Sequence, residues 1–236
     1  MHKTKSTIIV ALDYAHIDPL KQLVDQLSPE LCRVKIGNIL FTRYGPSLVE
    51  RLMRQGFDVF LDLKFHDIPQ TVAGACRSAA ELGVWMVNLH IAGGAAMMSA
   101  AREMTDSFKI RPLLMGVTVL TSLVEADLQP LGMRADVSDV VLNMAKLAKT
   151  QGLDGVVCSP QEVRLLRFEL GNDFLLVTPG IRSREEQGLD DQKRTMTPEA
   201  AVAAGANYLV VGRPITQSAH PAQALRSLNQ ALQKLK

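Results

Sequence analysis

Aromatic residues are scarce in this chain: they make up 5% of its 236 residues, with a single tryptophan. An excess of charge of one sign is also lacking, because 26 Lys and Arg residues stand against 24 Asp and Glu residues, a formal net charge of +2. Proteins that bind nucleic acid present clustered positive charge, and those that bind single strands add aromatic stacking platforms. The composition therefore argues against a nucleic-acid partner.

Cysteine is rare as well. The three cysteines, Cys32, Cys76 and Cys158, are odd in number, far apart and flanked by aliphatic residues. Neither a disulfide framework nor a zinc site has this pattern, so we expect buried thiols in a reducing compartment, the cytoplasm. Near the N-terminus the apolar run Ile8–Leu12 is short and meets Asp13, so we expect no signal peptide and no membrane-spanning segment.

Short apolar runs, by contrast, are plentiful, and they alternate with helix-like segments. Eight runs rich in Val, Ile, Leu or Phe have the length and composition of strands. They are Thr7–Leu12, Cys32–Gly37, Asp58–Lys64, Trp85–Ile91, Pro112–Leu120, Gly155–Ser159, Phe174–Thr178 and Tyr208–Gly212. Between them, Asp18-Pro19 and Thr197-Pro198 are typical of a helix cap followed by a first-turn proline.

This order of strand then helix predicts the fold class. Near-continuous apolar strands separated by helices indicate a parallel sheet covered by helices. Eight such units in 236 residues fit an α/β protein of the (β/α)8 TIM-barrel type, for which about 250 residues are typical. With 47% hydrophobic residues and no linker-like stretch, we expect one domain over residues 1–236. A doubly wound open sheet is the alternative.

Charged residues gather in the stretch LDLKFHDIPQT, residues 61–71, where the third apolar run ends. Strand side chains alternate between the two faces of a sheet, so Asp62 and Lys64 point one way and their apolar neighbours the other. Burying such charges is costly unless they are paired. This face therefore holds either a plain ion-pair network or a ligand site, and the stretch alone leaves both open.

Polar residues also recur where other predicted strands end. They are Asp13 after the first run, Lys35 in the second, Asp62 and Lys64 in the third, His90 in the fourth and Thr121 after the fifth. In a (β/α)8 barrel the chemistry lies at the carboxyl ends of the strands. We therefore expect these side chains to meet at one mouth of the barrel.

Two further segments favour anion binding at that mouth. After the eighth run, VVGRPIT contains Gly212, which permits a close backbone approach, and Arg213, whose forked guanidinium suits a phosphate. After the seventh, TPGIRSREEQGLDDQKRT is a long polar loop of the kind that forms active-site lids, and its Arg182 and Gln192 can reach an anion or an amide. Barrels of this class often bind phosphate at these loops.

Lys64 has a carboxylate on either side in the sequence, Asp62 and Asp67, and carboxylates keep a lysine protonated. That disfavours a Schiff-base nucleophile and favours a proton donor or a stabiliser of a carbanion. A divalent metal held by Asp13, Asp62 and Asp67 is conceivable. We do not expect one, because Lys64 and Lys35 already neutralise these carboxylates.

These residues resemble the orotidine 5′-phosphate decarboxylase family. LDLKFHDIP matches that family's Asp-x-Lys-x-x-Asp signature, and further motifs lie in the family's order over almost the whole chain. They are VALD, VKIG, VTVLTS, TPGIR, DQKRTMTP and VVGRPIT. The resemblance implies a homodimer that converts orotidine 5′-monophosphate to UMP and CO₂, the last step of de novo pyrimidine biosynthesis, with no metal or organic cofactor.

The resemblance also implies a role for each matching residue. Lys64 would donate a proton to C6 of the pyrimidine, Asp62 would lie beside the departing carboxylate, and Lys35 and Asp13 would hold the ribose hydroxyls and the charge network. Asp67 and Ile68 would enter the partner subunit's site. The remaining roles fall on Thr71 at the end of the binding segment, Thr121 at the pyrimidine edge, Arg182 and Gln192 over base and phosphate, and Gly212 and Arg213 on the phosphate. His66 and His90 are expected to be structural.

Two alternatives remain at this point. Relatives with the same signature, 3-keto-gulonate-6-phosphate decarboxylase and hexulose-phosphate synthase, are expected to need Mg²⁺, and the lid-like loop with DQKRTMTP argues against them. A non-catalytic barrel that binds a phosphoribosyl ligand is the other, and the intact Asp62-x-Lys64-x-x-Asp67 signature argues against it.

Overall fold

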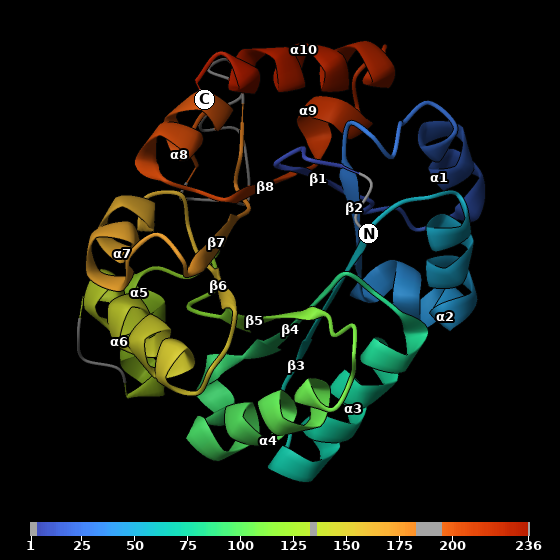
Figure 1. Ribbon diagram of the computed structural model, residues 1–236. Coiled ribbons are helices and arrows are strands. Elements are labelled where there is room, and N and C mark those ends of the chain that lie inside the picture. Colours follow the sequence, from blue (N-terminus) through green and yellow to red (C-terminus); the bar gives the residue numbers. More distant parts are fainter. Residues whose placement is uncertain (1–3, 133–135, 183–194, 236) are drawn as a thin grey trace.

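The computed structural model describes residues 4–132, 136–182 and 195–235. Within them, eight parallel strands close into a barrel in the order of the sequence (Figure 1). The strands are β1 Ile8–Ala11, β2 Arg33–Gly37, β3 Val59–Phe65, β4 Met86–His90, β5 Leu113–Val117, β6 Gly155–Val157, β7 Leu175–Thr178 and β8 Tyr208–Val211. The predicted TIM barrel is confirmed, and the doubly wound alternative is wrong.

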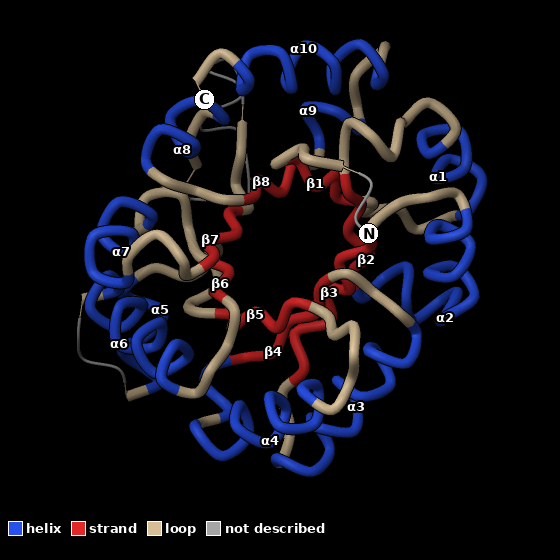
Figure 2. The backbone as a smooth tube through the Cα atoms, in the orientation of Figure 1, coloured by secondary structure: helices blue, strands red, loops and turns tan. Residues whose placement is uncertain are grey.

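Helices surround the ring of strands, as the tube view in Figure 2 shows. They are α1 Ile17–Val24, α2 Asn38–Arg54, α3 Pro69–Leu82, α4 Ala95–Asp106, α5 Glu125–Leu128, α6 Val137–Thr150, α7 Val163–Leu170, α8 Pro198–Ala204, α9 Arg213–Thr216 and α10 Pro221–Gln233, with 3-10 turns η1 Ile91–Gly93 and η2 Gln129–Leu131. In the described part of the chain, none of these helices has the length and apolar character needed to cross a membrane.

The two predicted helix starts have different outcomes. Thr197 caps α8 as expected, since its hydroxyl accepts a hydrogen bond from the backbone N–H of Ala200 at 3.3 Å. Asp18 does not cap α1: that helix begins at Ile17, and His16 occupies the cap position without a side-chain hydrogen bond. Asp18 instead lies in the first turn, where its negative charge interacts favourably with the positive end of the helix dipole.

The strands are buried on both faces, which explains their almost unbroken apolar composition. Outward side chains pack under the helices in one large core. Inward side chains fill the barrel with a second, smaller cluster that includes Ile9, Phe60, Met86, Met115 and Val177. Because side chains alternate along a strand, the residues two positions beyond this layer project into the mouth at the carboxyl ends of the strands.

The opposite end of the barrel is closed by Arg33, which lies two residues before Lys35 on the same inward face of β2. Its guanidinium carbon lies 4.3 Å from the ring centre of Trp85 and 5.2 Å from that of Tyr208. The same guanidinium donates to the backbone carbonyls of Thr4 and Ser6. The cation is therefore stacked and hydrogen-bonded at once, a structural plug rather than a ligand site.

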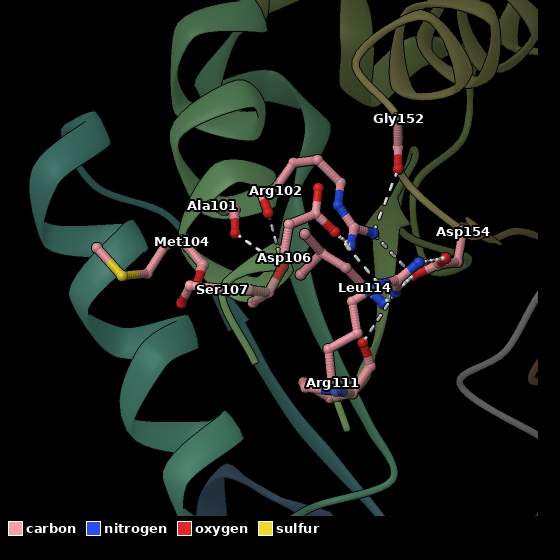
Figure 3. A network of polar contacts seen from close by, with 11 residues as sticks. Ala101, Arg102, Met104, Asp106, Ser107, Arg111, Leu114, Gly152 and Asp154 are labelled. Carbon is pink, nitrogen blue, oxygen red and sulfur yellow. Dashed lines mark hydrogen bonds and ion pairs between the residues drawn. The ribbon is translucent and has the colours of Figure 1, made fainter. Parts of the chain in front are cut away.

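A second charged cluster ties α4 to the amino ends of β5 and β6 (Figure 3). Both nitrogens of the Arg111 fork bind the carboxylate of Asp154 at 2.8 Å. Arg102 adds an ion pair to Asp154 at 3.4 Å, and both arginines also face Asp106. Asp154 further accepts the backbone N–H of Leu114 at 2.7 Å. We call Arg102, Asp106, Arg111 and Asp154 the arginine cluster.

Candidate active site

Four charged side chains of alternating sign form a continuous chain at the mouth of the barrel. Lys35 Nζ lies 3.1 Å from Asp13 Oδ1 and 3.3 Å from Asp62 Oδ2. Lys64 Nζ lies 2.7 Å from the other oxygen of Asp62, Oδ1. We call Asp13, Lys35, Asp62 and Lys64 the mouth charges. The structure thus brings together the charged residues that the alternation along β1, β2 and β3 places at one end.

The interior of this chain is buried, and its electrostatics follow from that. Burial acts to lower the pKa of Lys35, but the carboxylates of Asp62 and Asp13 outweigh it and hold that pKa above its ordinary value. Burial acts to raise the pKa of Asp62, but Lys35, Lys64 and a hydrogen bond from Asn88 outweigh it and hold that pKa below its ordinary value of 3.8. Both groups are therefore charged at neutral pH, before any ligand arrives.

Asn88 is a site residue that the sequence analysis missed. It lies on β4, has no solvent exposure, and donates from Nδ2 to Asp62 Oδ1 at 2.7 Å. Its Oδ1 accepts the backbone N–H of Lys64 at 2.8 Å. The available signal was its spacing, since Asn88 lies two residues beyond Met86, which points into the barrel, and is a polar residue between Val87 and Leu89.

A cavity of about 490 Å³ opens beside the mouth charges. Its lining includes all four of them, together with Thr121, Arg182, Gly212 and Arg213 among the predicted binding residues. Apolar side chains such as Phe60, Val117 and Val210 also line it. Cys158 and Gln217 also line the cavity, and the sequence analysis assigned no binding role to either. The cavity thus joins a lysine–aspartate end to an arginine.

Two of these predicted residues differ in how they reach the cavity. Arg182 is 7% exposed and donates to the carbonyl of Ile181 at 2.9 Å, so its guanidinium is held against its own backbone. Arg213 is exposed and begins the short helix α9 directly after Gly212. Gln192, predicted to close over the base and phosphate, lies outside the described residues.

Asp67, Ile68 and Thr71 are brought to the surface rather than into the cavity of their own chain. All three are exposed, Ile68 to 67%. The Asp67 carboxylate accepts the backbone N–H of Ile68 at 2.7 Å, and Pro69 then opens α3. Ile39, at the start of α2, is a second exposed apolar side chain, at 62%. The signature is therefore split between an inward half and an outward half.

His66 and His90 lie beside each other at the ends of β3 and β4, with ring centres 5.4 Å apart. Burial, with the nearby positive charge of Lys64 and the neighbouring His66, holds the pKa of His90 below its ordinary value. Among the described residues, no group of three His, Cys, Asp or Glu side chains is arranged as a metal-ligand set. The two carboxylates of the mouth charges, Asp13 and Asp62, both form ion pairs with Lys35.

With this geometry in view, comparison with known proteins is specific. A sequence model of the "Orotidine 5'-phosphate decarboxylase / HUMPS family" matches residues 6–228. The chain is 56% identical over 232 residues to the orotidine 5'-phosphate decarboxylase of Coxiella burnetii, covering 97% of this chain and 98% of the relative. It is 55% identical over 228 residues to the one named likewise in Chromobacterium violaceum, covering 97% and 92%.

Solved structures agree. A crystal structure of orotidine 5'-phosphate decarboxylase from Lactobacillus acidophilus superposes with a TM-score of 0.85 at 36% identity, covering 95% of this chain and 98% of that one. An uncharacterized conserved protein from Geobacillus kaustophilus gives a TM-score of 0.83 at 37% identity, covering 95% and 99%. The chain therefore belongs to the orotidine 5′-phosphate decarboxylase / HUMPS family.

Proposed function

We propose that this protein converts orotidine 5′-monophosphate to UMP and CO₂ in pyrimidine biosynthesis. The observation that carries the proposal is the chain of mouth charges at one end of a cavity that also reaches Arg213. A nucleotide with a carboxylate on its base and a phosphate on its ribose matches both ends. The relatives named orotidine 5'-phosphate decarboxylase support the same substrate.

The chemistry explains why lysine is needed. Loss of CO₂ from C6 leaves a carbanion in the plane of the ring, where the π-system cannot spread its charge. Positive charge must therefore be in place beforehand, because reorganising it during the reaction would add to the barrier. Lys64, held 2.7 Å from Asp62 and 30% exposed toward the cavity mouth, supplies that charge and then the proton to C6.

Asp62 acts on the departing carboxylate. Its own carboxylate is 12% exposed and ionised, so a substrate carboxylate placed beside it is repelled. The repulsion weakens as CO₂ forms and loses its charge, which favours the transition state over the bound substrate. In our proposal Lys35 and Asp13 complete the network and bind the ribose hydroxyls.

The other predicted binding residues hold the nucleotide in place. Thr121 reads the pyrimidine edge, Arg182 and Gln192 close over base and phosphate, and Gly212 with Arg213 binds the phosphate. Contacts to a phosphate far from C6 contribute binding free energy that can orient the base against Lys64. Arg213→Ala should therefore weaken UMP binding about tenfold to a hundredfold, the worth of one charged hydrogen-bonded contact, measured by calorimetry. Unchanged affinity would place the phosphate elsewhere.

The proposal includes a two-fold homodimer with shared sites. The exposed run from Asp67 to Thr71 supports it, together with the exposed Ile39, because these residues follow β3 and β2 at the mouth end and yet do not line the cavity of their own chain. In the dimer, Asp67 and Ile68 enter the partner's site, where Asp67 meets the ribose and the mouth charges, and Thr71 closes the binding segment.

Complementation tests the shared site. Homodimers of Lys64→Ala and of Asp67→Ala should each be nearly inactive, whereas subunit exchange between them should restore one complete site in each heterodimer. Exchange is verified by native mass spectrometry. A verified heterodimer without activity would show that Asp67 acts within its own chain, provided that the double variant mixed with wild type keeps one working site.

Turnover itself is tested with the wild-type protein. Orotidine 5′-monophosphate is added in excess EDTA, and the change in pyrimidine absorbance is followed. We expect rapid conversion to UMP. Activity that appears only on adding Mg²⁺, or only on a sugar phosphate of the HUMPS type, would reassign the protein within its family. Binding of UMP without turnover would indicate a non-catalytic barrel.

We also propose that the protein works in the cytoplasm. Cys32, Cys76 and Cys158 are buried, and burial raises the pKa of the first two thiols to about 12. Such thiols remain protonated and unreactive. Fractionation of the producing cell tests the location, and recovery outside the cytoplasm would contradict it.

A further inference from the structure

The pairing between β3 and β4 is interrupted at Lys64. Leu61 pairs with Val87 and Phe65 with Leu89, so three residues of β3, from Asp62 to Lys64, lie opposite one residue of β4, Asn88. A bulge of this kind disrupts the hydrogen-bond ladder and re-aims the side chains that it carries. The side chains re-aimed here are those of the proposed proton donor and its carboxylate partner.

The bulge places Lys64 in an unusual backbone conformation. Its φ of 52° is the one positive φ of a non-glycine residue in the described chain. A residue with a Cβ atom is disfavoured in this left-handed region, and such residues persist only where their surroundings hold them. Extended backbone at Lys64 would change the direction of its Cα–Cβ bond and remove the register shift around it, so the ammonium would not keep its present position.

The side chain of Asn88 stabilises this conformation of Lys64. Its Oδ1 accepts the Lys64 backbone N–H at 2.8 Å, and its Nδ2 donates to Asp62 Oδ1 at 2.7 Å. The orientation of the amide is fixed by its partners, because a backbone N–H can only donate and an ionised carboxylate can only accept. One fully buried side chain thus bridges both ends of the bulge in place of the missing ladder bonds.

Both bonds bear on the same pair of reacting groups. Asp62 Oδ1 receives Asn88 Nδ2 and Lys64 Nζ together, each at 2.7 Å, while Oδ2 faces Lys35 at 3.3 Å. Asn88 therefore fixes the rotation of the carboxylate from one side and the backbone of the lysine from the other. Without it, the strand could relax and both groups would move relative to a bound ligand.

We propose that Asn88 is a positioning residue of the decarboxylation: its amide holds the bulge that aims Lys64 and Asp62 at the substrate. The inference rests on the proposed function but concerns a different residue, which acts through its two neighbours. It predicts a selective loss of turnover with little loss of binding, since the phosphate and base contacts lie elsewhere.

Kinetics of Asn88→Ala provide the first test. We expect kcat for orotidine 5′-monophosphate to fall about a hundredfold, the effect of misplacing a reacting group by about 1 Å, with UMP affinity nearly unchanged. The matched control is Asn229→Ala, which removes another buried amide with bonds to Leu31 and Leu225. The control should lose stability and keep kcat. A folded Asn88→Ala with the kcat of this control would overturn the proposal.

Asn88→Asp keeps the shape and provides a readout that a merely structural role would not move. A protonated carboxyl group can donate to Asp62 and accept from Lys64, as the amide does, whereas an ionised one can only accept. Two adjacent carboxylates raise one of their pKa values, so the variant carries the shared proton at low pH and loses it as pH rises. The ratio of its kcat to that of wild type should therefore fall with rising pH. A flat ratio would contradict the proposal.

A crystal structure of Asn88→Ala tests the positioning without any turnover. We expect Lys64 to return to extended backbone and its Nζ to leave Asp62. If φ of Lys64 stays near the present 52° and the 2.7 Å contact persists, Asn88 is not what holds it. Wild-type inactivity on orotidine 5′-monophosphate would instead refute the proposed function, and the two failures are thus separable.

Discussion

Each end of the barrel carries a cluster of two carboxylates and two cations, and the cations of the two clusters differ. The mouth charges contain lysines, and the arginine cluster at the amino ends of β5 and β6 contains arginines. Arg111 grips Asp154 through two parallel bonds of 2.8 Å, a geometry that fixes both partners. A guanidinium does not give up its proton in proteins, whereas an ammonium is a point charge that can. The two clusters therefore have the same number of charges and different capacities. The arginine cluster is suited to holding the fold together, and the mouth charges are suited to proton transfer.

Solvent access differs in the same direction. The bonds of Asp154 are all to protein groups: two arginines and the backbone of Leu114. At the mouth, Lys64 remains 30% exposed and borders the cavity, so its remaining donors face the space where a ligand binds. Satisfied polar groups rigidify a fold, whereas a protonated donor left facing a cavity is available for chemistry.

Lys64→Ala should produce the largest effect of the substitutions considered, because it removes the reactive cation from the mouth charges. Removing both the proton donor and its charge should lower kcat by about 10⁴-fold or more. UMP should still bind, since Arg213 and the cavity wall remain. Stopped-flow or steady-state absorbance measures kcat, and calorimetry measures UMP affinity. Near-native turnover would remove Lys64 from its role.

Asp154→Asn should have the next largest effect, a loss of stability, because it disrupts the arginine cluster. The substitution keeps the shape but leaves Arg102 and Arg111 with one carboxylate, Asp106, between them. We expect the free energy of unfolding to fall by about 3 kcal/mol, the low end for breaking a buried pair, because the Arg111 side chain is 33% exposed. Denaturant unfolding measures it. The folded variant should keep the wild-type kcat, and a large loss of kcat would mean that the two ends are coupled.

The difference between the two clusters could be predicted only in part from the sequence. Asp62 and Lys64 were identifiable because strand alternation and the barrel place them at one mouth. Arg102 and Asp154 were not, since they meet only when α4 and the turn before β6 come together, 52 residues apart. Asn88 was missed because its role depends on the bulge opposite it, and the alternating residues of β3 give no sign of a bulge.

The mouth charges also contribute to stability, and Asp62→Asn tests how that contribution depends on the protonation of Asp62. Because the folded-state pKa of Asp62 is depressed, its carboxylate stabilises the fold at pH values above the unfolded pKa, and this contribution is lost as pH falls through the folded value. We expect wild type to exceed the variant by about 2 kcal/mol in free energy of unfolding at neutral pH. The excess should hold down to the ordinary value of 3.8 and shrink below it. An excess that is equal at pH 3 and pH 7 would contradict the assignment.

The smallest effect is expected where the distance is the same and the surroundings are not. Lys146 Nζ lies 2.7 Å from Glu169 Oε2, the distance that separates Lys64 from Asp62, but the side chains are 49% and 31% exposed and join α6 to α7 on the outside. Water screens such a pair, so Lys146→Ala should change the free energy of unfolding by about 0.2–1 kcal/mol and leave kcat unchanged. Added salt should erase the difference, since it screens exposed charges. A loss as large as that of Asp154→Asn would show that distance, rather than burial, governs these pairs, and the contrast between the two ends of the barrel would then need another cause.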